Sequence, residues 1–201
     1  MEACRIIGIT SAQPSEGKST SAVNTAFSLA ELEKKVILID ADMRRSSIHT
    51  KLNLLQTPRL SDLLTDSNDI RAAIKTYHSR DGATSFDIIP AGNPPKNPSE
   101  LLTSNRMERL LDALAAAYDY IILDLPPVGA VIDAVSVGKH TDGMIVVVRE
   151  NNCPVPVFDD CIHQLKFAGI RILGFVVNGA LEGSGKGYGY KYGGYGSNKY
   201  Y

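Results

Sequence analysis

Six short stretches of the chain are mainly apolar and predict buried β-strands. In most of them isoleucine, leucine and valine follow one another directly instead of alternating with polar residues. Continuous apolar runs of this kind are typical of parallel strands that are covered by helices on both faces. The predicted strands span residues 6–9, 36–39, 86–89, 120–124, 143–149 and 172–178.

Segments with the features of helices lie between these strands. A helix is predicted over residues 22–30, and another over residues 155–168, where Gly169 supplies a C-cap. A third begins at residues 97–100, because Asn-Pro-Ser-Glu places a capping residue, a first-turn proline and an acidic residue in the preferred order. Its continuation carries an apolar stripe, which consists of Met107, Leu110, Leu111 and Leu114.

The order of these elements indicates the fold class. Residues 46–85 are polar and poorly periodic, and only 61–64 and 70–74 suggest short helices. Elsewhere strands and helices alternate, which predicts an α/β fold with a doubly wound, mostly parallel sheet and helices on both faces. No linker divides this region, so we expect one domain over residues 1–180.

The composition changes sharply near the C-terminus. Residues 183–201 consist only of glycine, tyrosine, serine, lysine and asparagine. Without aliphatic side chains this segment cannot bury enough apolar surface to order itself, so a flexible tail is expected over residues 181–201. It holds six of the nine tyrosines: Tyr188, Tyr190, Tyr192, Tyr195, Tyr200 and Tyr201. A sticky tail without a chemical role and a set of functional tyrosines are both open interpretations.

Overall composition excludes several classes of function. The net charge of −1 gives no electrostatic reason to expect binding to nucleic acid or to an anionic membrane. Cys4, Cys153 and Cys161 are odd in number and lack metal-ligand spacing, which favours inert thiols in a reducing compartment. Neither a membrane-spanning run nor a signal-peptide pattern is present. We therefore expect a cytoplasmic protein that needs a partner to associate with a membrane.

The segment between the first strand and the first helix has the pattern of a phosphate-binding P-loop. Backbone N–H groups of such a loop converge at a helix N-terminus, where the helix dipole favours an anion. Gly17 permits close approach of a phosphate, Lys18 adds a cation for the outer phosphates, and the Ser19 hydroxyl can ligate Mg²⁺. Ala12 stands where the strict motif has glycine, and an ordinary glycine-containing turn is the alternative. The predicted nucleotide-binding residues are Ser15, Glu16, Gly17, Lys18, Ser19 and Thr20.

Three carboxylates are predicted to lie beside this loop. Asp40, Asp42 and Asp124 follow apolar strands, and ligands of open α/β sheets bind at the carboxyl ends of strands. Ser19 and Asp124 suit a metal ion, while Asp40 or Asp42 is a candidate base or second metal anchor. Arg44 is either a source of charge stabilisation for phosphoryl transfer or an ordinary salt-bridge or surface residue.

Taken together, the motifs resemble those of the bacterial tyrosine kinases, the cytoplasmic P-loop enzymes of capsular and exopolysaccharide export systems. The resemblance covers nearly the whole chain. It rests on the tyrosine-rich tail and on four motif segments, which are residues 17–19 (Walker A), 37–44 (Walker A′), 121–127 (Walker B) and 90–92 together with 97–102. The combination of Asp-x-Asp-x-Arg with the tyrosine-rich tail is highly specific for this family.

The resemblance implies an ATP–Mg²⁺-dependent protein-tyrosine kinase that autophosphorylates its tail tyrosines, one subunit's tail entering another's active site. It assigns catalytic roles to Lys18, Asp40, Asp42, Arg44 and Asp124, with metal ligation by Ser19 and the three aspartates. The implied partners are other copies of the chain, a cognate tyrosine phosphatase and a membrane-spanning adaptor similar to a polysaccharide chain-length regulator. The adaptor would recruit the kinase to the inner face of the cell membrane, where it regulates capsular or exopolysaccharide synthesis and export.

Two rival functions remain. Partitioning and division-site ATPases of the same superfamily carry a second lysine early in the loop, where this chain has Gln13, and they have no tyrosine-rich tail. A non-catalytic nucleotide-binding scaffold is the other rival. The presence of all five polar residues expected for phosphoryl transfer argues against it; these are Lys18, Ser19, Asp40, Asp42 and Asp124. Family members also carry a Glu-x-x-Arg-x-x-Arg helix before the first strand, used in ring assembly. This chain starts at residues 1–5 directly before that strand, so we expect a shortened form or a different assembly.

Overall fold

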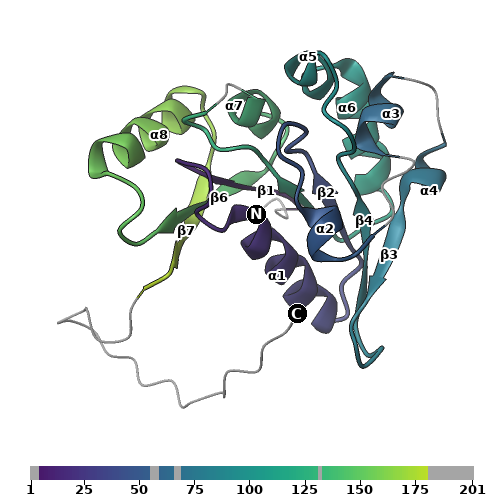
Figure 1. Ribbon diagram of the computed structural model, residues 1–201. Helices are drawn as coiled ribbons and strands as arrows, with labels where there is room; N and C mark the ends of the chain where they lie inside the picture. Colours follow the sequence, from purple (N-terminus) through teal and green to yellow (C-terminus); the bar gives the residue numbers. More distant parts are fainter. Residues whose placement is uncertain (1–4, 55–58, 66–68, 131–132, 181–201) are drawn as a thin grey trace.

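A seven-stranded sheet forms the centre of the molecule (Figure 1). The computed structural model describes residues 5–54, 59–65, 69–130 and 133–180. The strand order is β3-β4-β2-β5-β1-β6-β7, and all neighbouring strands are parallel except β3 and β4. The strands are β1 Ile6–Ser11, β2 Val36–Asp40, β3 Lys75–His78, β4 Ser85–Ile89, β5 Tyr120–Asp124, β6 Gly143–Arg149 and β7 Ile172–Asn178. The predicted doubly wound α/β fold is confirmed.

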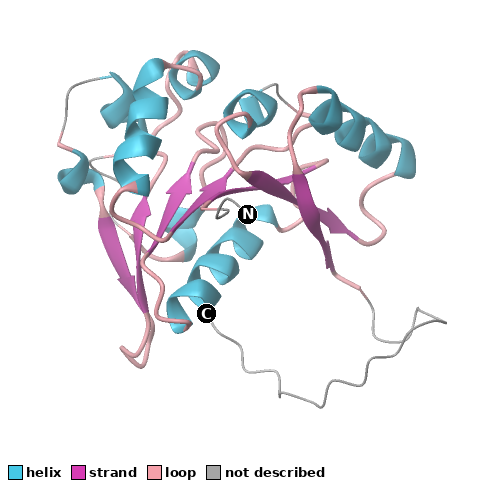
Figure 2. Cartoon of the chain, turned by 180° about the vertical axis from the view of Figure 1, so that it is seen from behind, coloured by secondary structure: helices cyan, strands magenta, loops and turns pink. Residues whose placement is uncertain are grey.

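Helices cover both faces of the sheet (Figure 2). The helices are α1 Lys18–Glu31, α2 Ile48–Lys51, α3 Leu60–Thr65, α4 Ile70–Ala73, α5 Pro98–Leu102, α6 Asn105–Ala115, α7 Asp133–Gly138 and α8 Val155–Phe167. Helices α1 and α2 bury their apolar side chains in one core cluster, and α3 to α8 bury theirs in another. The two clusters lie on opposite faces because successive side chains of a strand point to opposite sides.

Alternation along the strands places the polar strand ends. In β2, Val36 and Leu38 belong to the cluster on the α1 face, whereas Ile37 and Ile39 belong to the other. Asp40 continues the α1-facing series and pairs in register with Asp124 at the end of β5. Both carboxylates are therefore directed to the face where α1 begins.

The predicted single helix after Asn97 is two helices in the structure. Thr103 and Ser104 separate α5 from α6, and their hydroxyls donate to the carbonyl oxygens of Ser99 and Leu101 at 2.9 and 2.7 Å. Such side-chain-to-backbone hydrogen bonds compete with helical ones and favour a break. Asn97 occupies the N-cap position, but its amide donates to the Glu100 carboxylate at 3.0 Å instead of capping the backbone.

Three elements were not predicted from the sequence: α2, α7 and β3. Strand β3 lies inside the segment interpreted as polar and irregular, and it pairs antiparallel with β4 at the edge of the sheet. Two of its four residues are exposed, so its sequence carries little apolar signal.

The predicted tail and its tyrosines lie outside the described residues, and the division into residues 1–180 and 181–201 stays a prediction. Within the described residues, no helix has the length and hydropathy needed to span a bilayer.

Candidate active site

The loop between β1 and α1 is shaped by two residues with positive φ. Gly17 has φ of 100° at the N-cap of α1, and Ser15 has φ of 66°. The Asn178 amide at the end of β7 donates to the Glu16 carbonyl at 3.0 Å and lies directly against Gly17. A residue of the last strand therefore holds the loop that follows the first strand.

Glu16 holds the loop from inside the protein. Its side chain is fully buried, and its carboxylate accepts the N–H groups of Gln13 at 2.7 Å and Arg149 at 3.3 Å. The other predicted loop residues, Ser15 and residues 17–20, line an open cleft of about 630 Å³. The sequence predicted that Glu16 binds nucleotide. In the structure its buried side chain supports the loop through these hydrogen bonds.

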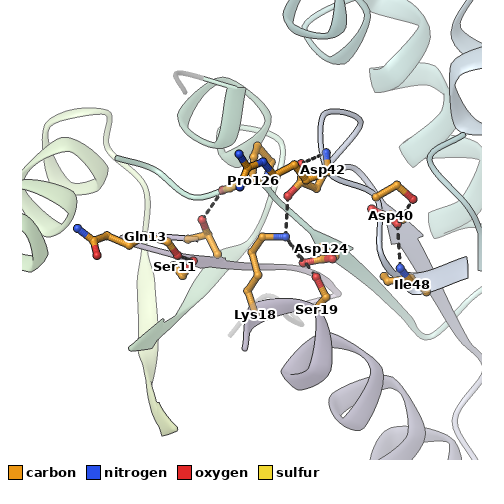
Figure 3. A network of polar contacts seen from close by, with 12 residues as sticks. Ser11, Gln13, Lys18, Ser19, Asp40, Asp42, Ile48, Asp124 and Pro126 are labelled. Atoms are coloured by element: carbon orange, nitrogen blue, oxygen red, sulfur yellow. Dashed lines mark hydrogen bonds and ion pairs between the residues drawn. The ribbon is translucent and has the colours of Figure 1, made fainter. Parts of the chain in front are cut away.

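Lys18 points across the cleft floor to the carboxylates (Figure 3). Its ammonium nitrogen lies 2.8 Å from Asp42 Oδ2, 3.2 Å from Asp124 Oδ1 and 3.3 Å from Ser19 Oγ. Both ion pairs are buried, so water screens them weakly. Lysine, hydroxyl and two carboxylates are thus gathered at one point, as the positions of the motifs predicted.

Burial and mutual repulsion shape the ionisation of this group. Burial alone would lower the pKa of Lys18, but Asp124 and Asp42 outweigh it and keep the pKa above the usual 10.5. Burial raises the pKa of Asp124, although Lys18 opposes the change. Burial and the neighbouring Asp124 charge raise the pKa of Asp40 to about 7, while hydrogen bonds from Ser46 and Ile48 partly oppose this. The site holds more negative charge than Lys18 alone neutralises.

The donor set fits a magnesium ion bound together with phosphate. One buried carboxylate oxygen of Asp40 and one of Asp124 have no hydrogen-bond partner, and the Ser19 hydroxyl adjoins Asp124. Among the described residues, no three histidine, cysteine or acidic side chains are close enough to hold a metal by themselves. Mg²⁺ is commonly bound by one or two carboxylates together with water and phosphate oxygens, so such a cluster is not required.

Arg44 lines the same cleft and hydrogen-bonds to two other residues. Its guanidinium donates from Nε to Asp133 Oδ2 at 2.9 Å and from Nη2 to Ser99 Oγ at 3.1 Å. One of the two interpretations of Arg44, a salt bridge, is therefore present. Its role in charge stabilisation during phosphoryl transfer stays a prediction.

Several cleft residues were not recognised in the sequence. They are Arg45 after β2, Lys51 at the end of α2, Arg149 at the end of β6, and Asn178 at the end of β7. All except Lys51 lie at or just beyond carboxyl ends of parallel strands, where ligands of α/β sheets bind. That rule, applied to the last two strands as well, would have identified Arg149 and Asn178.

The raised pKa of Asp40 predicts a pH-dependent effect of Asp40→Asn. The folded protein keeps a proton on Asp40 up to about pH 7, whereas the unfolded chain loses it near 3.8, so the folded state loses stability as pH rises through this interval. We expect Asp40→Asn to raise the free energy of unfolding of the nucleotide-free protein by about 2 to 4 kcal/mol at pH 8, and little at pH 4. Urea unfolding at both pH values measures this, with Asp112→Asn on α6 as control. An equal gain at both pH values would contradict the explanation.

Comparisons with known proteins agree with this geometry. A family model described as an AAA domain matches residues 4–163. The chain is 36% identical over 182 residues to "Tyrosine-protein kinase YwqD" of Bacillus subtilis (strain 168), covering 90% of this chain and 75% of that protein. It is 34% identical over 185 residues to "Tyrosine-protein kinase etk" of Escherichia coli (strain K12), covering 92% of this chain but 25% of that one. The chain thus spans about a quarter of the length of several curated relatives.

Solved structures give the same result. The kinase domain of Escherichia coli Etk superposes with a TM-score of 0.84 at 34% identity, covering 96% of this chain and 74% of that domain. The septum site-determining protein MinD of Pyrococcus horikoshii superposes with a TM-score of 0.70 at 24% identity, which shows a common fold. From its motifs, fold and relatives, the chain belongs to the bacterial tyrosine-protein kinase family.

Proposed function

We propose that this chain transfers the terminal phosphoryl group of ATP–Mg²⁺ to tyrosine hydroxyls in its own C-terminal segment. The observation that carries the proposal is the convergence of Ser19, Asp42 and the buried Asp124 on the Lys18 ammonium, beside the cleft that Lys18, Ser19 and Asp42 line. The curated relatives named tyrosine-protein kinases support the choice of tyrosine as acceptor.

The position of β7 also supports this proposal. Asn178, its last residue, lines the cleft and hydrogen-bonds to the P-loop, so residues 181–201 begin three positions beyond a cleft residue. Tyr188 follows Asn178 by ten residues, which span at most roughly 35 Å when extended. The acceptors themselves lie outside the described residues.

The chemistry proposed for the site uses an exchange of partners by Lys18. The outer phosphates would attract the Lys18 ammonium away from Asp42, which frees Asp42 Oδ2 at the cleft surface. Bond formation from the tyrosine oxygen to the terminal phosphorus accompanies cleavage of the bond between that phosphorus and the bridging oxygen of ADP. Asp42 orients the phenol and accepts its proton, which suffices in a loose transition state where positioning dominates.

The remaining polar groups hold the ion and the phosphates. Asp124, Ser19 and Asp40 provide the oxygen donors that Mg²⁺ prefers, and the ion, when bound, neutralises charge on the phosphates. Backbone N–H groups at the start of α1 cradle the phosphates, where the helix dipole favours negative charge. Burial of the three groups keeps these interactions strong.

The wider setting is proposed from the relatives. One is named "Putative tyrosine-protein kinase in cps region" in Klebsiella pneumoniae, which supports a role in capsular or exopolysaccharide synthesis and export. We propose a membrane-spanning adaptor similar to a polysaccharide chain-length regulator as a partner of this kinase, as the family resemblance implies. That adaptor would recruit the kinase to the inner face of the membrane, and a cognate phosphatase would reverse the modification.

Incubation of the protein with ATP and Mg²⁺ tests the proposed activity. We expect phosphotyrosine that maps by mass spectrometry to residues 188–201. Transfer between copies predicts a rate per molecule that rises with protein concentration. Truncation after residue 180 should remove the acceptors and leave nucleotide binding intact. Release of ADP without phosphotyrosine, even with the adaptor's cytoplasmic segment added, would favour an ATPase. Nucleotide binding without turnover would favour a scaffold.

A further inference from the structure

Arg44, Ser99 and Asp133 form a closed hydrogen-bonded group at the rim of the cleft. Arg44 donates from Nε to Asp133 and from Nη2 to Ser99, and the Ser99 hydroxyl donates to the second oxygen of Asp133. The three residues come from the loop after β2, from α5 and from the first position of α7. Segments that are far apart in the sequence therefore meet at one guanidinium group.

The burial of the two charged partners is very different. The Asp133 side chain is 1% exposed, whereas the Arg44 side chain is 43% exposed. A buried carboxylate whose two oxygens are both occupied is a fixed anchor, and the guanidinium is the part that reaches the solvent-filled cleft. A charge-assisted hydrogen bond with one buried partner also holds its geometry better than an exposed ion pair.

One nitrogen of Arg44 remains available. Nε and Nη2 are used by Asp133 and Ser99, and Nη1 has no hydrogen-bond partner among the described residues. Arg44 follows Asp42 by two positions, and Asp42 binds the Lys18 ammonium that is expected at the outer phosphates. Arg44 and Asp42 both line the cleft, so Arg44 lies in the part of the cleft where the outer phosphates are expected.

We propose that Asp133 and Ser99 are positioning residues that hold Arg44 so that its free edge contacts the terminal phosphoryl group. This rests on the proposed function of the same site. Without its anchor, a half-exposed arginine explores many rotamers, and ordering it on each turnover costs conformational entropy. Arginine suits the role because its planar fork can bind a carboxylate with one edge and a phosphate with another.

A double-mutant cycle on phosphotyrosine formation tests this. We expect Arg44→Gln to lower kcat roughly 100-fold, as for loss of one transition-state donor, and Asp133→Asn to lower it about tenfold. Their KM values for ATP should change less than about threefold. Arg44→Gln/Asp133→Asn should be no slower than Arg44→Gln alone, because Asp133 acts through Arg44. Multiplying effects would overturn the proposal. If Asp133→Asn folds poorly, Ser99→Ala takes its place in the cycle, because it removes only a hydroxyl. It should show the same non-additivity with Arg44→Gln.

A binding measurement separates this inference from the kinase proposal. Titration calorimetry with Mg–ADP and a non-hydrolysable Mg–ATP analogue gives the preference for the triphosphate. Arg44→Gln and Asp133→Asn should each reduce that preference about three- to tenfold, and the double variant no further. An unchanged preference in either single variant would overturn the inference, even if phosphotyrosine forms. Asp62→Asn is the matched control, since Asp62 pairs with Arg59 through the same atoms outside the cleft.

Discussion

Replacing Lys18 by methionine is expected to reduce ATP-dependent phosphotyrosine formation by roughly 10³-fold or more, as when a cation at a transferring phosphoryl group is lost. Lys18 is the side chain that joins Asp42, Asp124 and Ser19, and methionine matches its volume without its charge. Initial rates at saturating ATP and Mg²⁺ measure the effect. Lys34→Met changes an exposed lysine and should leave the rate unaltered. A Lys18→Met variant within tenfold of the wild type would show that Lys18 has no part in transfer.

The same substitution should destabilise the nucleotide-free protein. Methionine leaves Asp42 and Asp124 buried beside each other without their cation, and breaking a buried pair on one side costs about 3–5 kcal/mol. The loss should be largest at pH 8 and smaller at pH 5, because burial raises the pKa of Asp124 and a lower pH favours the protonated form without the unpaired charge. Urea unfolding with chelator present measures it. Equal losses at both pH values would indicate a packing defect in place of an electrostatic one.

Much of the fold could be predicted because the central parallel strands are largely buried on both faces. The runs that became β1, β2, β5 and β6 are nearly continuous in isoleucine, leucine and valine, and they form the centre of the sheet. The edge strand β3 was not predicted because one of its faces is exposed, which weakens the apolar pattern in its sequence. Among the described strands it pairs with β4 alone. Short helices such as α2 owe their stability to contacts made after folding, since a single turn is unstable alone.

The chemistry of the site was predicted more completely than its supports. Lys18, Asp42 and Asp124 meet because each follows a strand or loop whose end has a fixed position in a doubly wound sheet. The roles of Glu16 and Asp133 depend on side chains buried against distant segments, which no local pattern records. Glu16 carries the charge expected of a surface loop residue, yet it is fully buried as an acceptor of backbone N–H groups.

Replacing Gly17 by alanine is expected to weaken binding of Mg–ATP by roughly 100-fold. Gly17 has φ of 100°, which costs a residue with a Cβ atom about 1–3 kcal/mol. That Cβ would also lie 2.2 Å from Asn178 Nδ2. Asn178 could withdraw only by giving up its hydrogen bond to the Glu16 carbonyl, at a cost of about 1 kcal/mol. The free protein would relax into another loop conformation, so nucleotide binding must restore the strained one and loses affinity by that amount.

Gly82→Ala is the matched control for this effect. Gly82 has φ of 71°, but a Cβ there meets nothing within 4 Å, so alanine carries the backbone cost without a clash and away from the cleft. It should lower the melting temperature slightly and leave the Kd for Mg–ATP unchanged. Adding Asn178→Ala to Gly17→Ala should recover little affinity, because the backbone strain remains and the support of Glu16 is lost. Full recovery would mean that steric contact alone requires glycine here. Wild-type affinity in Gly17→Ala would mean that the nucleotide binds without the loop conformation seen in this structure.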